Sequence, residues 1–152
     1  MHMTFISEFL SNHMLVCGVV AYFAAQILKI IILLIRERRI DFGLMFASGG
    51  MPSSHSSTVA ALCISAGRIH GVGSSYFAIT LILASIVMYD AAGVRRAAGE
   101  HAKILNQLLA DLTSGDQERT EAGLKELIGH TPLQVVMGAL LGIAIPFLIP
   151  LP

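Results

Sequence analysis

The sequence predicts an all-α fold: a polytopic membrane helical bundle of about four transmembrane helices plus an interfacial helical segment. Composition is the first observation, because 55% of the 152 residues are hydrophobic and only 13% are charged. A soluble domain of this size carries more charge on its surface. The second observation is that apolar residues gather in runs close to the roughly 20 residues that a bilayer requires. Together they indicate a single integral membrane domain over residues 1–152.

The apolar runs place the expected spans at residues 14–35, 56–69, 76–92 and 132–150. Only His70 to Ser75 separates the second span from the third, so these two are expected to form a tight antiparallel hairpin. A chain with two spans is the alternative. The first span has no basic leader and no small-residue cleavage site, so we expect it to be retained rather than removed as a signal sequence.

Residues 93–130 form a polar insertion between the third and fourth spans. A helix is expected to begin near Val94, because apolar residues recur on one side of it. These residues are Ile104, Leu105, Leu108, Leu109 and Leu112. We expect this helix to lie along the membrane surface or to pack over the site. Residues 113–121 are polar and turn-like, which fits either a lid or a solvated connector.

The distribution of basic residues predicts the orientation of the chain. If the spans alternate, residues 36–52 and 93–130 emerge on one face, and both termini lie on the other. The first face carries Arg36, Arg38, Arg39, Arg95, Arg96, Lys103, Arg119 and Lys125. The second face carries at most Arg68. The positive-inside rule then places the first face in the cytoplasm, and we expect a bacterial inner membrane.

The total charge and the cysteines limit the function classes. Ten basic and ten acidic residues cancel, so nothing argues for a nucleic acid partner. Cys17 and Cys63 fall inside expected spans without metal-ligand spacing, and we expect them to be small apolar residues rather than a disulfide. Four histidines are expected at the surface or the membrane interface, without a role. They are His2, His13, His70 and His101.

Residues 49–58, Gly-Gly-Met-Pro-Ser-Ser-His-Ser-Ser-Thr, combine glycine, hydroxyls and an imidazole directly before an apolar run. Glycine lets the backbone approach a ligand, and the amides of a first helical turn point at an anion, most often phosphate. The alternative is that Ser53 or Ser54 caps a helix and that His55 is a polar residue near an interface.

Three polar clusters meet at the same expected membrane face: Lys29 to Arg36, Pro52 to His55, and His130. A lysine inside a span is costly and marks a polar site, unless its ammonium reaches back to water. Gly138 and Gly142 form a small-xxx-small pair that packs two helices, either within one molecule or across a homodimer. The convergence of charged and imidazole side chains predicts a site at this face.

These clusters resemble the three signatures of the type 2 phosphatidic acid phosphatase superfamily. Lys29 with Arg36 corresponds to the first signature, Pro52–His55 to the second, and His130–Gly138 to the third. The chain is most similar to the small divergent branch of that superfamily, which is related to acid phosphatases and vanadium-dependent haloperoxidases. That branch shares the run from Gly49 to His55 and the stretch from Asp90 to Asn106, so the resemblance covers most of the chain.

The resemblance implies a role for each matched residue. It makes His130 the nucleophile that attacks phosphorus and His55 the general acid that protonates the leaving oxygen. It also implies a group of side chains that hold the phosphate oxygens. These are Lys29, Arg36, Ser53 and Ser54, with a further guanidinium from Arg95 or Arg96.

The chain departs from the superfamily pattern at three positions. Glu37 stands where the first signature has proline, and Leu124 stands where the third has arginine. Gln134 replaces the aspartate that normally orients the nucleophilic imidazole. Its carbonyl can accept the imidazole N–H but cannot offset an imidazolium charge, so lower activity is expected unless Asp90 or Glu100 replaces the carboxylate.

The sequence therefore predicts a membrane-embedded lipid phosphatase that hydrolyses a phosphomonoester or pyrophosphate head group through a phosphohistidine intermediate. Its partners are the lipid phosphate substrate and the surrounding lipids. No cofactor and no metal are required by this chemistry. Asp90, Glu100 and Glu126 could nonetheless bind a divalent ion together with the phosphate. The alternative is a non-catalytic lipid-phosphate binding or transport protein that retains the phosphate pocket.

Overall fold

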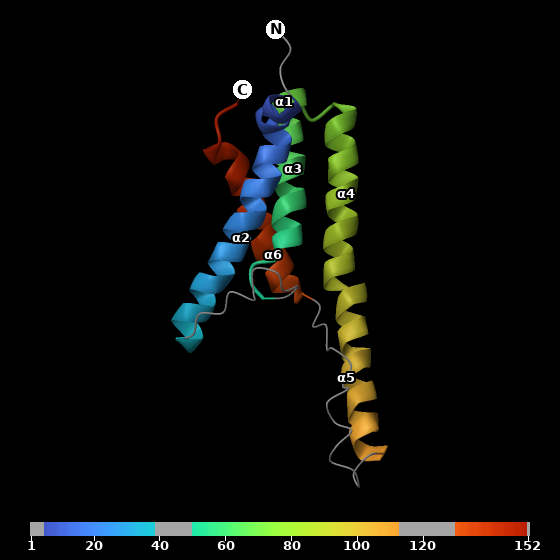
Figure 1. Ribbon diagram of the computed structural model, residues 1–152. Helices are drawn as coiled ribbons and strands as arrows, with labels where there is room; N and C mark the ends of the chain where they lie inside the picture. Colours follow the sequence, from blue (N-terminus) through green and yellow to red (C-terminus); the bar gives the residue numbers. More distant parts are fainter. Residues whose placement is uncertain (1–4, 39–49, 113–129, 152) are drawn as a thin grey trace.

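The computed structural model describes residues 5–38, 50–112 and 130–151, and every regular element in these residues is a helix (Figure 1). The all-α prediction is thus confirmed. In chain order the helices are α1 Phe5–Ser11, α2 His13–Glu37, α3 Ser54–His70, α4 Ser75–Ala92, α5 Val94–Leu112 and α6 Pro132–Leu148. The sequence did not predict α1, which ends just before Asn12. The Asn12 side chain then caps α2 by accepting a hydrogen bond from the Leu15 amide.

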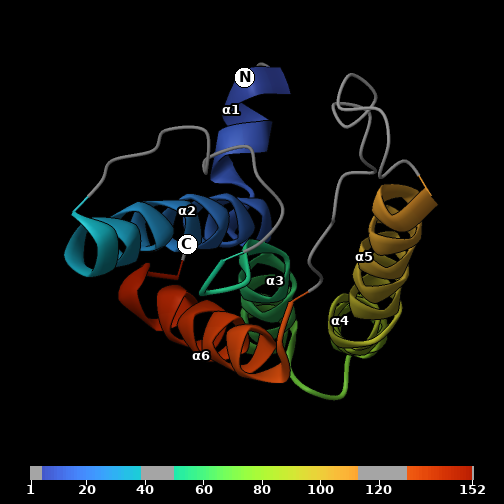
Figure 2. The same ribbon diagram turned by 90° about the horizontal axis from the view of Figure 1, so that it is seen from below.

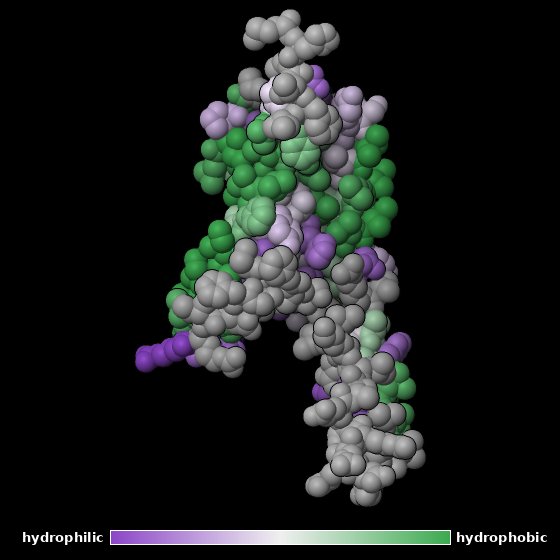
Figure 3. Space-filling model, in the orientation of Figure 1, coloured by the Kyte–Doolittle hydropathy of each residue, from purple (hydrophilic) through white to green (hydrophobic). Residues whose placement is uncertain are grey.

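Each of the four expected spans coincides with a helix. Within the described residues, α2 and the run over residues 75–108 are long and apolar enough to cross a membrane, and α6 is a shorter apolar helix. The count of four spans stays a prediction. The outer surface agrees with a lipid environment, since hydrophobic side chains cover α2 and α4 over much of their length (Figure 3). Many of them are exposed, among them Val19, Phe23, Ile27, Ile79 and Ile86, and Leu140 of α6 is exposed as well.

The helices alternate in direction (Figure 1). α2 and α4 run from the end that carries α1 to the opposite end, and α3 and α6 run back. We call the end with α1 the distal end. The other end, which we call the motif end, brings together the last turns of α2 and the first turns of α3 and α6. The sequence clusters around Lys29, Ser53 and His130 therefore meet at the motif end, as the alternation of spans predicted.

α3 is the central helix, with α2 and α6 on one side and α4 on the other (Figure 2). Small residues allow this close packing. Cys17 and Ala21 of α2 meet Ala61 of α3 and Ile145 of α6 in one core cluster. A second cluster joins α3 to α4 through Val59, Cys63 and Ala84. Both cysteines are buried and free, as expected.

Gly138 and Gly142 bring α6 into direct contact with the backbone of α3. A Cβ atom added at Gly138 would overlap the Ser53 carbonyl, and one added at Gly142 would overlap the Ser57 carbonyl. The Cβ added at Gly142 would also lie 2.8 Å from the Cβ of Ala60. Of the two roles predicted for this pair, the structure shows the intramolecular one. A homodimer stays a prediction, and it would have to use another surface.

Of the two arrangements expected for α5, packing over the site is wrong, and a position along the membrane surface stays a prediction. α5 continues α4 away from the bundle and does not pack over α2, α3 or α6 in the described structure (Figures 1 and 2). The apolar side chains of Ile104, Leu105 and Leu108 are exposed along it. The side chains of Arg95, Arg96 and Glu100 lie outside the described part of the chain, as do residues 113–129 with Leu124 and Glu126.

The distal end is held together by polar side chains. His13, expected at the surface, is in fact buried. Its Nδ1 lies 2.8 Å from the Ser65 hydroxyl of α3, which gives the buried ring a polar partner. Arg68 donates a 3.4 Å hydrogen bond to the Ile149 carbonyl and stacks its guanidinium over the Phe147 ring at 5.0 Å. These contacts fasten α2 and α6 to the far end of α3.

Candidate functional site

A cavity of about 200 Å³ lies at the motif end, between α2, residues 50–51 and the start of α6. Three residues singled out by the sequence lie in its wall, namely Lys29, Arg36 and Gln134. Gly50 and Met51, from the run 49–58 that the sequence indicated, also line it. The structure adds Ile32, Leu33 and Glu37, which sequence reasoning did not assign to a site. The helical spacing of Lys29, Leu33 and Arg36 is the signal that could have found part of this wall, since residues three, four and seven apart share a face.

Lys29 is the most unusual residue of the cavity. It is 3% exposed, and its Nζ has no hydrogen-bond partner within the described residues. A lysine that reaches for water keeps its ammonium solvated, so this geometry does not fit that alternative. Burying an unpaired ammonium costs several kcal/mol, whereas an anion beside it offsets the cost. Arg36 lies two turns further along the same face and is exposed. The two cations thus line the cavity from its interior to its outer end.

Gly50 lets the connecting backbone pass beside Lys29. Its φ is +78°, a conformation that favours glycine, and a Cβ placed on it would lie 3.6 Å from Cδ of Lys29. Met51 and Pro52 follow and lead into α3. The Ser53 amide then donates a 3.0 Å hydrogen bond to the Gln134 carbonyl, which fixes this segment on α6.

Gln134 bonds to Ser53 through its backbone carbonyl, and its side chain contacts Thr131 and His130. Its Oε1 accepts a 3.0 Å hydrogen bond from the Thr131 amide, within a capping box that begins α6. The same atom lies 3.2 Å from Nδ1 of His130. A backbone amide can only donate, so the atom that faces it is the oxygen, and Nδ1 of His130 must then carry the proton. Gln134 therefore fixes one tautomer of a buried imidazole, in which Nε2 holds the lone pair.

Ser53 and Ser54 are both buried. The Ser53 hydroxyl caps α3, because it accepts hydrogen bonds from the Ser56 amide at 3.3 Å and the Ser56 hydroxyl at 3.0 Å. This is the capping role that the sequence left open as the alternative. With its amide bound to Gln134, Ser53 uses both groups inside the protein, and it holds the starts of α3 and α6 together.

The remaining described residues of the predicted site, His130, Ser53, Ser54, His55 and Asp90, are not among those that line the cavity. His55 is exposed in the first turn of α3 and is not among the described residues that line the cavity. Asp90 is half-buried near the end of α4. Arg95 and Arg96 belong to the first turn of α5, and their side chains lie outside the described part. Among the described residues, no three His, Cys, Asp or Glu side chains are grouped so as to hold a metal ion.

The fold and the cavity define an α-helical membrane protein with a cationic cavity at one end of its bundle. The chain belongs to the Divergent PAP2 family, whose model matches residues 10–145. It is 40% identical over 146 residues to a Bacillus subtilis (strain 168) protein named "Uncharacterized membrane protein YuiD", covering 90% of this chain and 92% of the relative. No solved structure matches the chain significantly. The predicted divergent branch of the superfamily is thereby confirmed.

Proposed function

We propose that this protein is a lipid phosphatase that removes a phosphate or pyrophosphate group from a membrane lipid. The observation that carries the proposal is the buried Lys29 ammonium, which has no partner in the cavity wall. A phosphate group supplies the missing negative charge, and the Arg36 guanidinium can bind its oxygens two at a time. Membership of the Divergent PAP2 family supports the same chemistry.

His130 is the proposed nucleophile. With Nδ1 protonated toward Gln134, the Nε2 lone pair attacks phosphorus while the bond from phosphorus to the lipid oxygen breaks. His55 gives its proton to that oxygen, so the lipid leaves as an alcohol, or as a monophosphate when the substrate is a pyrophosphate. A water molecule then attacks the phosphohistidine, His55 takes a proton from it, and inorganic phosphate and neutral His130 are released. Lys29 and Arg36 stabilise the charge on the equatorial oxygens.

The substrate class follows from the side of the membrane that the site faces. The excess of basic residues at the motif end supports a cytoplasmic site in a bacterial inner membrane. A phospholipid precursor such as phosphatidic acid or phosphatidylglycerol phosphate is then the expected substrate. A site that faced outward would favour a polyprenyl carrier.

Phosphate release tests the proposal directly. The purified protein in detergent is given a panel of lipid phosphates with and without EDTA, and the wild type is compared with His130→Ala and His55→Ala. His70→Ala is the matched control, because His70 is exposed at the distal end and stacks on Tyr76. Release is expected to persist in EDTA and in the control and to vanish in the two test variants. Release that survives His130→Ala would contradict the assigned nucleophile.

A non-catalytic lipid-phosphate binding or transport protein is the second candidate. The neutral Gln134 favours it, because a glutamine cannot stabilise the imidazolium that forms during turnover. Trapping separates the two candidates: a phosphatase incubated with ³²P-labelled substrate and quenched rapidly carries label on His130. A binding protein retains the lipid and carries no covalent label.

A further inference from the structure

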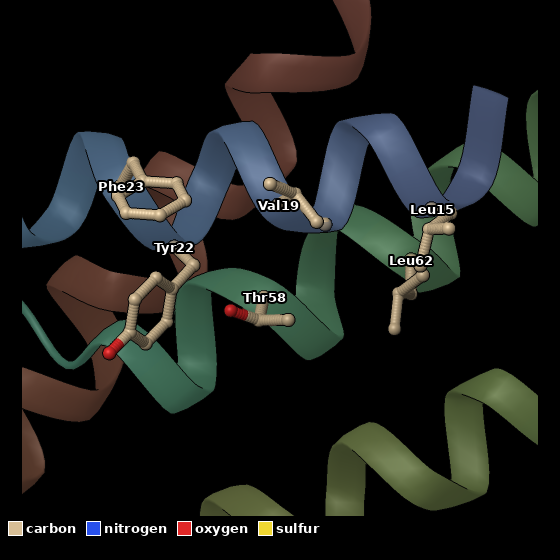
Figure 4. A pocket seen from close by; sticks show the side chains of 7 residues that line it. Leu15, Val19, Tyr22, Phe23, Thr58 and Leu62 are labelled. Atoms are coloured by element: carbon tan, nitrogen blue, oxygen red, sulfur yellow. The ribbon is translucent and has the colours of Figure 1, made fainter. Parts of the chain in front are cut away.

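A second, apolar groove of about 230 Å³ lies between α2 and α3. Side chains of α2 and α3 line it (Figure 4). Leu15 and Leu62 lie at one end and Tyr22 lies nearer the start of α3. The Thr58 hydroxyl donates within its own helix to the Ser54 carbonyl at 2.9 Å, so the groove presents hydrocarbon surface. The catalytic proposal does not use this groove.

The groove and the cationic cavity lie along one face of α2. Gly18 and Tyr22 line the groove and Lys29 lines the cavity, and their spacing of four and seven residues keeps them on the same side of the helix. Gln26 lies between them, fully buried, and its Nε2 donates a 3.1 Å hydrogen bond to the Tyr22 hydroxyl. The apolar surface thus leads along α2 toward the unpaired ammonium.

The α3 side of the groove also leads to the predicted site. His55, Thr58 and Leu62 are spaced by three and four residues and share one face of α3. His55 is exposed at the motif end of that face, and Thr58 and Leu62 line the groove behind it. A ligand in the groove would therefore have its polar end between the faces that carry Lys29 and His55.

The distance from the groove to Lys29 matches the thickness of one leaflet. Gly18 lies eleven residues before Lys29, about 16 Å along the helix axis. Half of a bilayer's hydrocarbon core is about 15 Å thick. The groove is also smaller than the roughly 300–1,000 Å³ of sites that enclose drug-sized ligands, which suits part of a single chain.

From this shared helix face and this distance we infer that the groove between α2 and α3 binds one hydrocarbon chain of the lipid whose phosphate occupies the cavity. The inference rests on the proposed function for the identity of the head group. It makes Gly18 a determinant of chain-length preference, because a Cβ there would lie 3.3 Å from Leu62 and 3.6 Å from Thr58 and so would fill the groove. Tyr22 marks the level at which the chain meets the polar end.

A photoreactive lipid tests the inference without depending on turnover. Phosphatidic acid with a diazirine in the middle of one acyl chain is irradiated with the full-length protein in lipid nanodiscs, and labelled peptides are mapped by mass spectrometry. Phosphatidylcholine with the same photoreactive chain reports ordinary bilayer contacts. We expect phosphatidic acid to label the peptides around Val19 and Thr58 several-fold more than phosphatidylcholine does, and Lys29→Met to abolish the difference.

Filling the groove gives the second arm. Gly18→Leu is expected to lower groove labelling and to reduce release from long-chain substrates about tenfold or more relative to short-chain, water-soluble analogues with the same head group. Leu62→Phe narrows the groove from α3 and keeps the test valid if Gly18→Leu fails to fold. Ala78→Leu, at an exposed position of α4, is the matched control.

The outcomes separate the inference from the proposed function. Equal labelling by both lipids, with or without Lys29, would mean that the groove holds only bulk bilayer lipid, and it would overturn the inference. An unchanged chain-length ratio in both groove variants would do the same. Selective labelling without any phosphate release would support the groove while contradicting the phosphatase.

Discussion

The two ends of the bundle differ in whether their charged and polar side chains have partners within the protein. At the distal end, His13 lies against Ser65, and Arg68 is bound to the Ile149 carbonyl and the Phe147 ring. At the motif end, Lys29 is more deeply buried than either His13 or Arg68, yet its Nζ has no partner in the described structure. A satisfied polar group contributes to stability, whereas an unsatisfied one lowers it and is retained where a ligand completes it. The comparison assigns a structural role to the distal end and a binding role to the motif end.

The largest expected effect is on catalysis at the motif end. Lys29→Met should lower phosphate release by about 10²–10³-fold, the usual loss when one group that stabilises the transition state is removed. Apparent stability should stay the same or rise, because an unpaired buried charge is replaced by an apolar side chain. Both quantities are measured on the purified protein, by phosphate release and by thermal unfolding in detergent. Lys103→Met, an exposed position on α5, serves as the control. A marked loss of stability in Lys29→Met would assign Lys29 to the structure instead.

The opposite pattern is expected at the distal end. Ser65→Ala removes the hydroxyl that lies 2.8 Å from Nδ1 of His13 and should lower the free energy of unfolding by about 1–3 kcal/mol. Activity per folded molecule should not change. Chemical unfolding followed by circular dichroism gives the first quantity. Ser85→Ala, an exposed serine whose hydroxyl bonds within α4, is the matched variant. A specific loss of activity in Ser65→Ala would show that the two ends are coupled.

Gln134→Glu sharpens the comparison by adding charge to the motif end. The side chain keeps its length and its place in the capping box, and a carboxylate can stabilise the imidazolium of His130. Release should rise about tenfold, as expected when a neutral hydrogen bond to a developing charge becomes an ionic one. Initial rates at saturating substrate measure this change. Gln134→Leu, which loses the bond to Nδ1, should move the rate the other way, and equal rates in both variants would rule out an orienting role.

The smallest effect is expected from Arg68→Met. The variant loses a long hydrogen bond to the Ile149 carbonyl and the stacking on Phe147, together about 0.5–1 kcal/mol. Arg68→Lys should recover part of the loss, because it keeps the charge near the ring. Unfolding midpoints of the two variants and the wild type, measured side by side, decide the point. No difference between methionine and lysine would show that only the hydrocarbon part of Arg68 contributes.

The sequence predicted what depends on local spacing. Apolar runs located all four expected helices, and the alternation of spans brought Lys29 and Gln134 to the same end of the bundle. Caps were partly predictable as well, since Ser53 precedes an apolar run and does begin α3. These features rest on helix periodicity and on the polar groups that helix starts require.

Features that depend on distant contacts could not be predicted in this way. His13 finds Ser65 fifty-two positions away, so no local pattern indicates its burial. The direction of α5 depends on the backbone at Gly93, where α4 ends, rather than on the apolar spacing within α5. The hydrogen bond from the Ser53 amide to the Gln134 carbonyl depends on how α6 packs on α3. For His13 and Ser53 the partner lies on another helix, and tertiary packing determines the outcome.

The glycine contact between α3 and α6 limits how the molecule can move. Ser53 is bound to Gln134, and the α6 backbone lies directly on α3 at Gly138 and Gly142, so no compressible side-chain layer separates the two helices at these positions. Such a contact resists sliding and rotation, because any displacement forces main-chain atoms into overlap. For the proposed phosphatase, this contact implies that His130 and His55 keep a fixed separation through the reaction cycle. The proposed entry of a lipid and exit of phosphate would therefore leave α3 and α6 fixed relative to each other.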